Sequence, residues 1–158
     1  MNYLNSKTFC ASAWFSTRNN NTEKLSPCCV IDCSKSKFKG KVEHTLNDTF
    51  ETWHNSDYMQ YLRKELDSGE FPEECVKCRQ DEKHNLRSVR LSSNKTIANN
   101  PKSQQINDSW MTAFFHNKHD LTSDVVVSMD AMISNFCNFE CVMCNSLDSS
   151  KIKSRWAK

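Results

Sequence analysis

Glycine and proline are nearly absent from this chain of 158 residues, which contains two glycines and three prolines. So little glycine excludes a collagen-like or flexible glycine-rich protein. No apolar run approaches the length of a bilayer span, which excludes a transmembrane protein and argues against a membrane partner. The net charge of +2 is too small to predict nucleic acid as a partner.

Apolar residues are also scarce, at 37%, whereas nine cysteines are present. An odd count leaves one thiol over in any complete set of intramolecular disulfides. The N-terminus lacks a basic stretch followed by an apolar one, so we expect a cytoplasmic protein with reduced thiols. In that setting clustered cysteines are more often metal ligands than disulfides, which remain the alternative.

The cysteines form a scattered N-terminal group and a compact C-terminal group. The scattered group is Cys10, Cys28, Cys29, Cys33, Cys75 and Cys78, and the compact group is Cys137, Cys141 and Cys144. An Asn/Lys/Ser-rich stretch between them predicts a polar linker, with one apolar island at 110–115. We therefore expect a cysteine domain at 1–93, a linker at 94–123 and the start of a second domain at 124–158.

Residues 48–68 predict two helices that lead toward the Cys75-x-x-Cys78 pair. Asp48 resembles the start of a capping box for the first helix, and Asn55-Ser56 interrupts it and caps the second. The second helix should bury one apolar face and turn the opposite face to water. The apolar face contains Tyr58, Tyr61, Leu62 and Leu66, and the polar face contains Arg63, Lys64 and Asp67. Gly69 and Pro72 end this helix.

In the last segment, Val125–Met129 has the β-branched, apolar pattern of a buried strand. After the compact cysteines, Ser146 or Asp148 is expected to cap a helix over Lys151–Trp156. The order is strand, cysteine loop and helix start, as in a β/α unit. Together with the N-terminal part, it predicts an α+β fold.

The compact cysteines have the spacing C-x3-C-x2-C. Three thiolates this close can wrap one side of a metal cluster. Structural zinc sites use four ligands, and no fourth Cys or His follows nearby, so zinc is the less favoured alternative. The spacing suits a 4Fe–4S cluster with one iron left open for another ligand.

With Asn138 after its first cysteine, this loop resembles the cluster-binding motif of the radical S-adenosylmethionine (SAM) superfamily. The resemblance implies that Cys137, Cys141 and Cys144 hold a 4Fe–4S cluster whose open iron binds SAM. It implies reductive cleavage of SAM to a 5′-deoxyadenosyl radical, which abstracts hydrogen from a substrate. Met143 stands where the family often has an aromatic residue, and it would pack near the adenine.

The N-terminal part resembles the auxiliary-cluster domain of SPASM or twitch type, which precedes the barrel in a subset of this superfamily. The matching positions are Phe9-Cys10, Trp14, Pro27-Cys28-Cys29, Leu46, 53–56, Arg63, Gly69, Pro72, Cys75, Cys78, Glu82, Ser88 and Arg90. The likeness covers most of residues 9–94 and resumes at 125–145. Where the family has a glycine turn about five residues before its Pro-Cys-Cys cysteine, this chain has Thr22-Glu23, with asparagines just upstream that also tolerate such a turn.

By this resemblance, the auxiliary 4Fe–4S ligands are Cys10, Cys28, Cys75 and Cys78. Four thiolates from distant segments would cross-link a domain with a small apolar core. Cys29 competes with Cys28, since adjacent residues in an extended segment point opposite ways, and Cys33 is a further alternate. A four-cysteine zinc site would hold the same fold and stays open.

The sequence thus predicts the N-terminal part of a radical SAM enzyme with two 4Fe–4S clusters and SAM. Only about fourteen residues follow Cys144, so the expectation is a truncated chain that is inactive alone or is completed by a separately encoded remainder of the barrel. Expected partners are a peptide or small-molecule substrate and a reductant such as flavodoxin or ferredoxin. The alternative is a non-catalytic iron–sulfur or zinc module for electron transfer or protein interaction.

Overall fold

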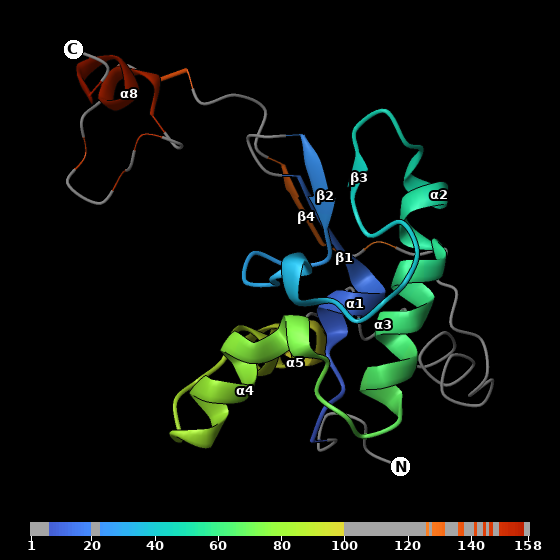
Figure 1. Cartoon of the computed structure of the whole chain (residues 1–158). Helices are drawn as coiled ribbons and strands as arrows, with labels where there is room; N and C mark the ends of the chain where they lie inside the picture. Colours follow the sequence, from blue (N-terminus) through green and yellow to red (C-terminus); the bar gives the residue numbers. More distant parts are fainter. Residues whose placement is uncertain are drawn as a thin grey trace.

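The computed structural model describes residues 7–19, 23–99, 126, 128–131, 136–137, 141, 144, 146 and 149–156, except the side chains of 97, 98 and 156. Short helices pack around a small sheet, so the predicted α+β class is confirmed (Figure 1). The elements are α1 (Ala11–Phe15), β1 (Ser16–Asn19), β2 (Lys24–Ser26), η2 (Cys33–Lys35), β3 (His44–Thr45), α2 (Phe50–His54), α3 (Asp57–Asp67), η3 (Glu73–Cys75), α4 (Val76–Lys83), α5 (Val89–Asn99), β4 (Ser128–Ala131) and α8 (Ser150–Trp156).

The sheet is mixed and has the strand order β3-β2-β1-β4. β1 and β2 are antiparallel, with Arg18 opposite Ser26, and β2 pairs with β3 in the same sense. β4 comes from the C-terminal segment and runs parallel to β1 over its whole length. An ion pair of 3.2 Å between Arg18 Nε and Asp130 Oδ2 joins the same two strands.

Two features of the expected domain organisation differ in detail. The strand expected to be buried at Val125–Met129 lies at Ser128–Ala131, and all four of its residues are exposed. It is an edge strand, and its side chains are not covered by the described part of the chain. Residue 94, the expected start of the linker, lies inside α5 with its side chain buried. Residues 101–125, which include the apolar island, lie outside the described residues.

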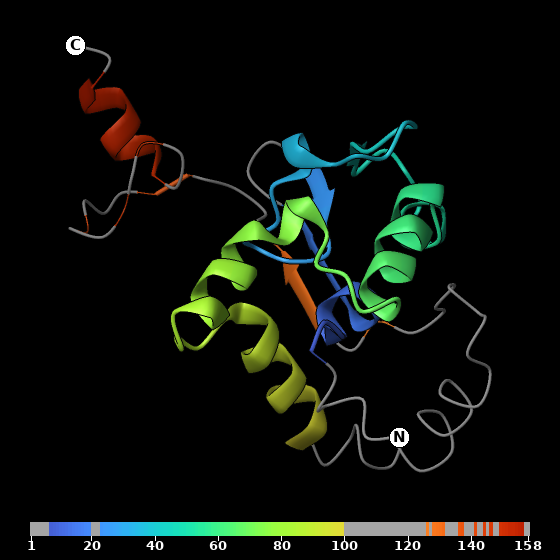
Figure 2. The same cartoon turned by 60° about the horizontal axis from the view of Figure 1, so that its bottom comes forward.

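The core forms where α1 lies between α3 on one side and α5 on the other (Figure 2). Every residue of α1 is buried. From α3, the predicted apolar face supplies Tyr58, Leu62 and Leu66 as buried residues, with Tyr61 partly buried against them. Trp53 of α2 completes the core and donates an Nε1 hydrogen bond of 2.9 Å to Thr17 Oγ1. The scattered cysteine segments are therefore held by apolar packing.

Arg63 is the exception to the predicted polar face, because its side chain is fully buried. Its Nε donates to the carbonyl of Ala13 at 2.8 Å. His54 Nε2 likewise lies 2.9 Å from the carbonyl of Trp14. A five-residue helix leaves most of its carbonyls without a partner inside the helix. The burial of the Arg63 guanidinium is therefore explained by the carbonyls of α1 that have no hydrogen-bond donor within the helix.

The predicted break into two helices is confirmed, although one cap differs. Ser56 Oγ accepts from Met59 N at 3.3 Å and caps α3, as expected. The first helix is capped by Thr49, whose Oγ1 accepts from Thr52 N at 3.1 Å, whereas Asp48 closes the preceding turn. Gly69 follows α3 with φ 89°, the left-handed conformation expected of it.

Candidate metal centre

The Cys75-x-x-Cys78 pair lies at the start of α4. Cys75 ends the short helix η3, and Cys78 follows in the first turn of α4, where its side chain is buried. Glu73 and Glu74 precede the pair in the turn set by Pro72. The unpaired N–H groups of a helix N-terminus favour negative charge, so this position suits thiolates.

Cys10 and Cys28 approach the pair from two other segments. Cys10 directly precedes α1 and is its N-cap residue. Cys28 lies in the turn after β2, where its carbonyl accepts from Ser26 Oγ at 3.2 Å. Five residues earlier, Glu23 has φ 63°. This chain therefore makes the left-handed turn with glutamate, at the place where the resembling family has glycine.

The four cysteines predicted to bind the auxiliary cluster line one cavity. Its wall consists of Cys10, Ser12, Cys28, Val30, Ile31, Leu66, Phe71, Cys75, Cys78, Val89 and Arg90. Apart from the thiols, one serine and Arg90, the residues of this wall are apolar, and Arg90 alone among them carries a permanent charge. The cavity measures about 20 Å³, close to the room that one water molecule needs. A larger group therefore requires its walls to separate.

Burial raises the pKa of three of these thiols, those of Cys10, Cys28 and Cys75. Burial raises the pKa of Cys10 above its ordinary value of 9.0, and the neighbouring Arg90 guanidinium opposes that rise. Burial, with the nearby Cys10 and Cys78, raises the pKa of Cys28 to about 12. The pKa of Cys75 is raised by burial and by the neighbouring cysteines. Metal ligation must then displace protons from this site.

The two alternate cysteines lie outside this cavity. Cys29 is exposed. Cys33 packs against α3, with its Sγ 3.7 Å from the hydroxyl oxygen of Tyr58. The structure thus separates Cys28 from its neighbour in the way that alternating side-chain directions predict.

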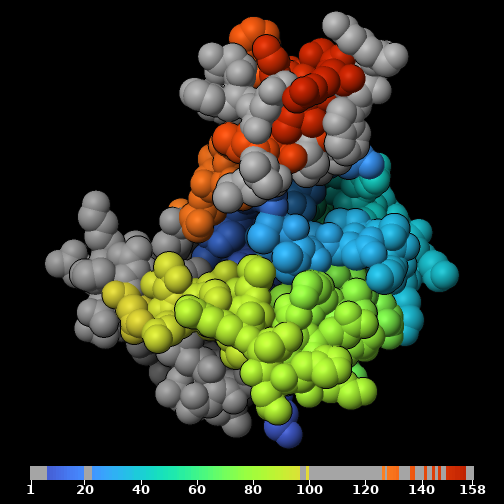
Figure 3. Space-filling view, turned by 90° about the vertical axis from the view of Figure 1, so that its left-hand side faces the viewer, coloured from blue at the N-terminus to red at the C-terminus, as the bar shows by residue number. Residues whose placement is uncertain are grey.

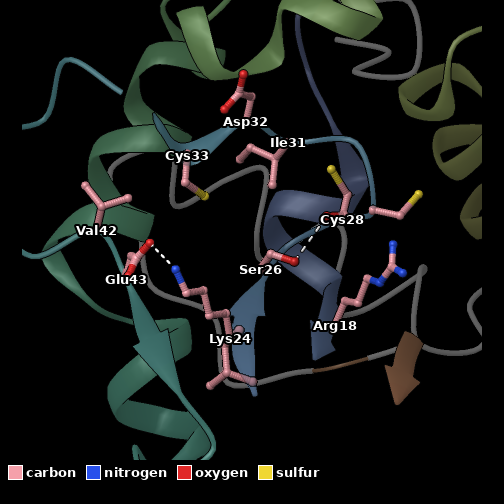
Figure 4. A pocket seen from close by; sticks show the side chains of 11 residues that line it. Arg18, Lys24, Ser26, Cys28, Ile31, Asp32, Cys33, Val42 and Glu43 are labelled. Atoms are coloured by element: carbon pink, nitrogen blue, oxygen red, sulfur yellow. Dashed lines mark hydrogen bonds and ion pairs between the residues drawn. The ribbon is translucent and has the colours of Figure 1, made fainter. Parts of the chain in front are cut away.

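A second, larger cavity of about 320 Å³ also has Cys28 in its lining (Figure 4). Its lining includes Arg18, Lys24, Cys33 and Glu43, and Lys24 forms an ion pair with Glu43. Cys28 lines both cavities.

Each of the three compact cysteines takes part in a hydrogen bond through its backbone. Cys144 N donates to the carbonyl of Cys141 at 3.0 Å. Ser150 Oγ accepts from Cys137 N at 3.0 Å. Asn138 and Met143 lie outside the described residues.

The last helix begins at Ser150, close to the predicted start. Ser149 Oγ accepts from Ile152 N at 3.4 Å, so Ser149 caps it. Of the two predicted caps, Ser146 was therefore wrong and Asp148 lies outside the described residues. Ser149 is fully buried and directly precedes α8, whose first residue, Ser150, accepts the hydrogen bond from Cys137 N.

Two features are absent from the described residues. In that part of the chain, no group of three or more Cys, His, Asp or Glu side chains is arranged to hold one metal ion. Also among the described residues, no helix is both long and apolar enough to cross a membrane.

No family model, curated protein or solved structure matches the chain. The resemblance to radical SAM proteins therefore depends on the cysteine motifs and the positions around them.

Sequence reasoning assigned no role to the polar groups behind the thiols. Glu82, Ser88 and Arg90 were noted only as matching positions. In the structure Ser88 Oγ and Arg90 both donate to the Glu82 carboxylate. Asn94 was missed altogether, because a buried asparagine in a polar segment gives no sequence signal.

Proposed function

We propose that this chain is the N-terminal part of a radical SAM enzyme. In this proposal Cys10, Cys28, Cys75 and Cys78 bind an auxiliary 4Fe–4S cluster. Cys137, Cys141 and Cys144 bind the cluster that carries SAM. The observation that carries the proposal is that four thiols from three separate segments line one cavity.

The donor set fits an iron–sulfur cluster. Soft thiolates select zinc or iron–sulfur clusters, and four cysteines are the usual ligands of a 4Fe–4S cluster. The apolar wall and the Arg90 guanidinium suit a group whose total charge with four thiolates is negative.

The remaining residues position these ligands. Apolar packing of α1 and α3 holds the Cys10 segment, and the start of α4 presents Cys75 and Cys78. At the second site, Ser150 fastens the backbone of Cys137. When bound and reduced, the cluster at that second site would supply the electron that cleaves SAM.

Anaerobic reconstitution with iron and sulfide, followed by counts of iron, sulfide and zinc, tests the proposal. We expect about eight irons per chain for the parent, as two 4Fe–4S clusters require. Single serine variants of Cys10, Cys28, Cys75 and Cys78 should each lose about four irons. The matched control is Cys33→Ser, which removes a cysteine of the same region that lies outside the thiol cavity and should keep the full count.

A second readout separates the two sites. Adding SAM to the reduced protein should change the electron paramagnetic resonance spectrum, and Cys144→Ser should abolish that change while Cys75→Ser leaves it. Stoichiometric zinc without iron in the parent would contradict the cluster proposal. Two clusters with no spectral response to SAM would contradict the enzyme proposal and favour an electron-transfer module.

A further inference from the structure

A polar network lies next to the thiol cavity, which is the small cavity lined by Cys10, Cys28, Cys75 and Cys78. It connects α4, α5 and the segment before α1. Glu82 of α4 accepts from Arg90 of α5, with Nε at 2.9 Å and Nη2 at 2.6 Å. Arg90 also donates through Nη1 to the carbonyl of Phe9 at 2.7 Å, next to Cys10. The side chain is only 4% exposed. The network therefore ties the helix that carries Cys78 to the segment that carries Cys10.

Asn94 holds the same segment from the next turn of α5. Its Nδ2 donates to the carbonyl of Phe9 at 3.0 Å, and its Oδ1 accepts from Ala11 N at 2.7 Å. These two groups belong to the residues on either side of Cys10. One neutral and one charged side chain thus grip the same carbonyl, and both are buried. Figure 3 shows α4 and α5 as neighbouring surfaces beside the N-terminal segment.

Arg90 and Glu82 carry opposite charges and lie at different places relative to the cavity that the four thiols line. Arg90 belongs to the wall of the thiol cavity, where it stacks 5.5 Å from the centre of the Phe71 ring. Glu82 does not line that cavity and sits behind Arg90. A cluster in the cavity would therefore face the guanidinium more closely than the carboxylate. In a low-dielectric wall, the nearer charge dominates the local potential.

We infer that Arg90, oriented by Glu82, positions Cys10 and raises the reduction potential of the auxiliary cluster, whereas Asn94 positions Cys10 alone. This inference depends on the proposed auxiliary cluster. Reduction adds one electron from an external one-electron reductant, without a new bond or a proton on Arg90. A fixed positive charge stabilises the reduced, more negative form.

The test is a redox titration of the N-terminal cluster, followed by its electron paramagnetic resonance signal, in a background where Cys137, Cys141 and Cys144 are serines. Arg90→Gln should lower the midpoint potential, and Glu82→Gln should raise it. Arg90→Lys should keep the potential close to that of the parent. Asn94→Ala should leave the potential unchanged while cluster release to a chelator becomes about tenfold faster.

A purely structural role would not shift the midpoint potentials of Arg90→Gln and Glu82→Gln in opposite directions. Equal potentials in Arg90→Gln, Glu82→Gln and the parent would overturn the inference while leaving the proposed cluster intact. Absence of any cluster in the parent background would overturn both. Because Arg90→Gln leaves a buried carboxylate without its partner, the double variant Arg90→Gln/Glu82→Gln serves as the folding control. It should assemble the cluster with a potential between those of the two single variants.

Discussion

The two cysteine groups of this chain are assembled in opposite ways. The N-terminal thiols come from three separate segments, and a buried core with clamped backbone brings them to one cavity. The C-terminal cysteines lie within eight residues of one another, and among the described residues there Cys141 and the side chain of Phe136 are exposed. Scattered ligands need a folded protein to meet, whereas compact ones are brought together by chain connectivity. The first site should therefore depend on the fold and the second on its local loop.

We expect the largest effect from replacing one proposed cluster ligand in each of the two cysteine groups. Cys75→Ser should remove about four irons and leave the SAM-responsive signal, whereas Cys141→Ser should remove about four irons together with that signal. The physical reason is that the proposed assignment gives each cluster its own ligand set. Iron analysis and paramagnetic resonance of both reconstituted variants check this. Loss of both clusters from either single variant would show one shared site.

A core substitution tests the dependence of the first site on the fold. Leu62 is buried in α3, and Leu62→Ala should lower the free energy of unfolding by about 2–5 kcal/mol. It should also lower the yield of the N-terminal cluster, because Cys10 is held by the same core. Met129→Ala on exposed β4 is the matched control and should change the free energy of unfolding by less than about 0.5 kcal/mol. Chemical denaturation of the metal-free chain measures both.

Alkaline pH should weaken the metal-free N-terminal domain through its buried thiols. The pKa of Cys28 is raised by burial from 9.0 to about 12 in the folded chain. Its contribution to stability is fully present below pH 9 and is lost as pH rises toward 12, because the unfolded chain releases the proton first. Denaturant midpoints under reducing conditions should fall across this window, and Cys28→Ser should flatten the fall. Cys141→Ser, which alters an exposed thiol of the other group, should leave the slope unchanged; an equal flattening there would contradict this account.

We expect the smallest change in stability from removing the ion pair that joins the N-terminal sheet to the C-terminal segment. The ion pair between Arg18 and Asp130 joins β1 to β4, and the carboxylate side chain is 65% exposed. Asp130→Asn should therefore cost no more than about 1 kcal/mol, with the difference vanishing at high salt. Thermal unfolding at low and high ionic strength measures it. A salt-independent loss of several kcal/mol would mean that the strand pairing itself depends on this pair.

Much of the N-terminal fold could be predicted because its signals are local. The apolar spacing of residues 58–66, the Ser56 cap and Gly69 each act within one or two turns of helix. The burial of Arg63 could not be predicted in the same way, because the carbonyls that it serves belong to α1, far away in the sequence. The exposure of β4 was also missed, since an apolar pattern does not reveal which strand ends at the edge of a sheet.

The site was predictable for its thiols and not for their surroundings. Motif spacing and the resemblance named Cys10, Cys28, Cys75 and Cys78, and the structure places all four around one cavity. The contacts that Arg90 and Asn94 make with the Cys10 segment emerge only from the packing of α5 against that segment. Long-range polar contacts of this kind depend on tertiary structure, and a single sequence carries no pattern for them.

The central claim is that the N-terminal thiols alone bind a 4Fe–4S cluster. Mössbauer spectroscopy of the chain with Cys137, Cys141 and Cys144 replaced by serine, reconstituted anaerobically with ⁵⁷Fe and sulfide, tests it most directly. The account predicts about four irons per chain in one cubane signal that does not respond to SAM. Bound zinc with no cubane signal, or a cubane that survives Cys10→Ser and Cys78→Ser unchanged, would contradict it.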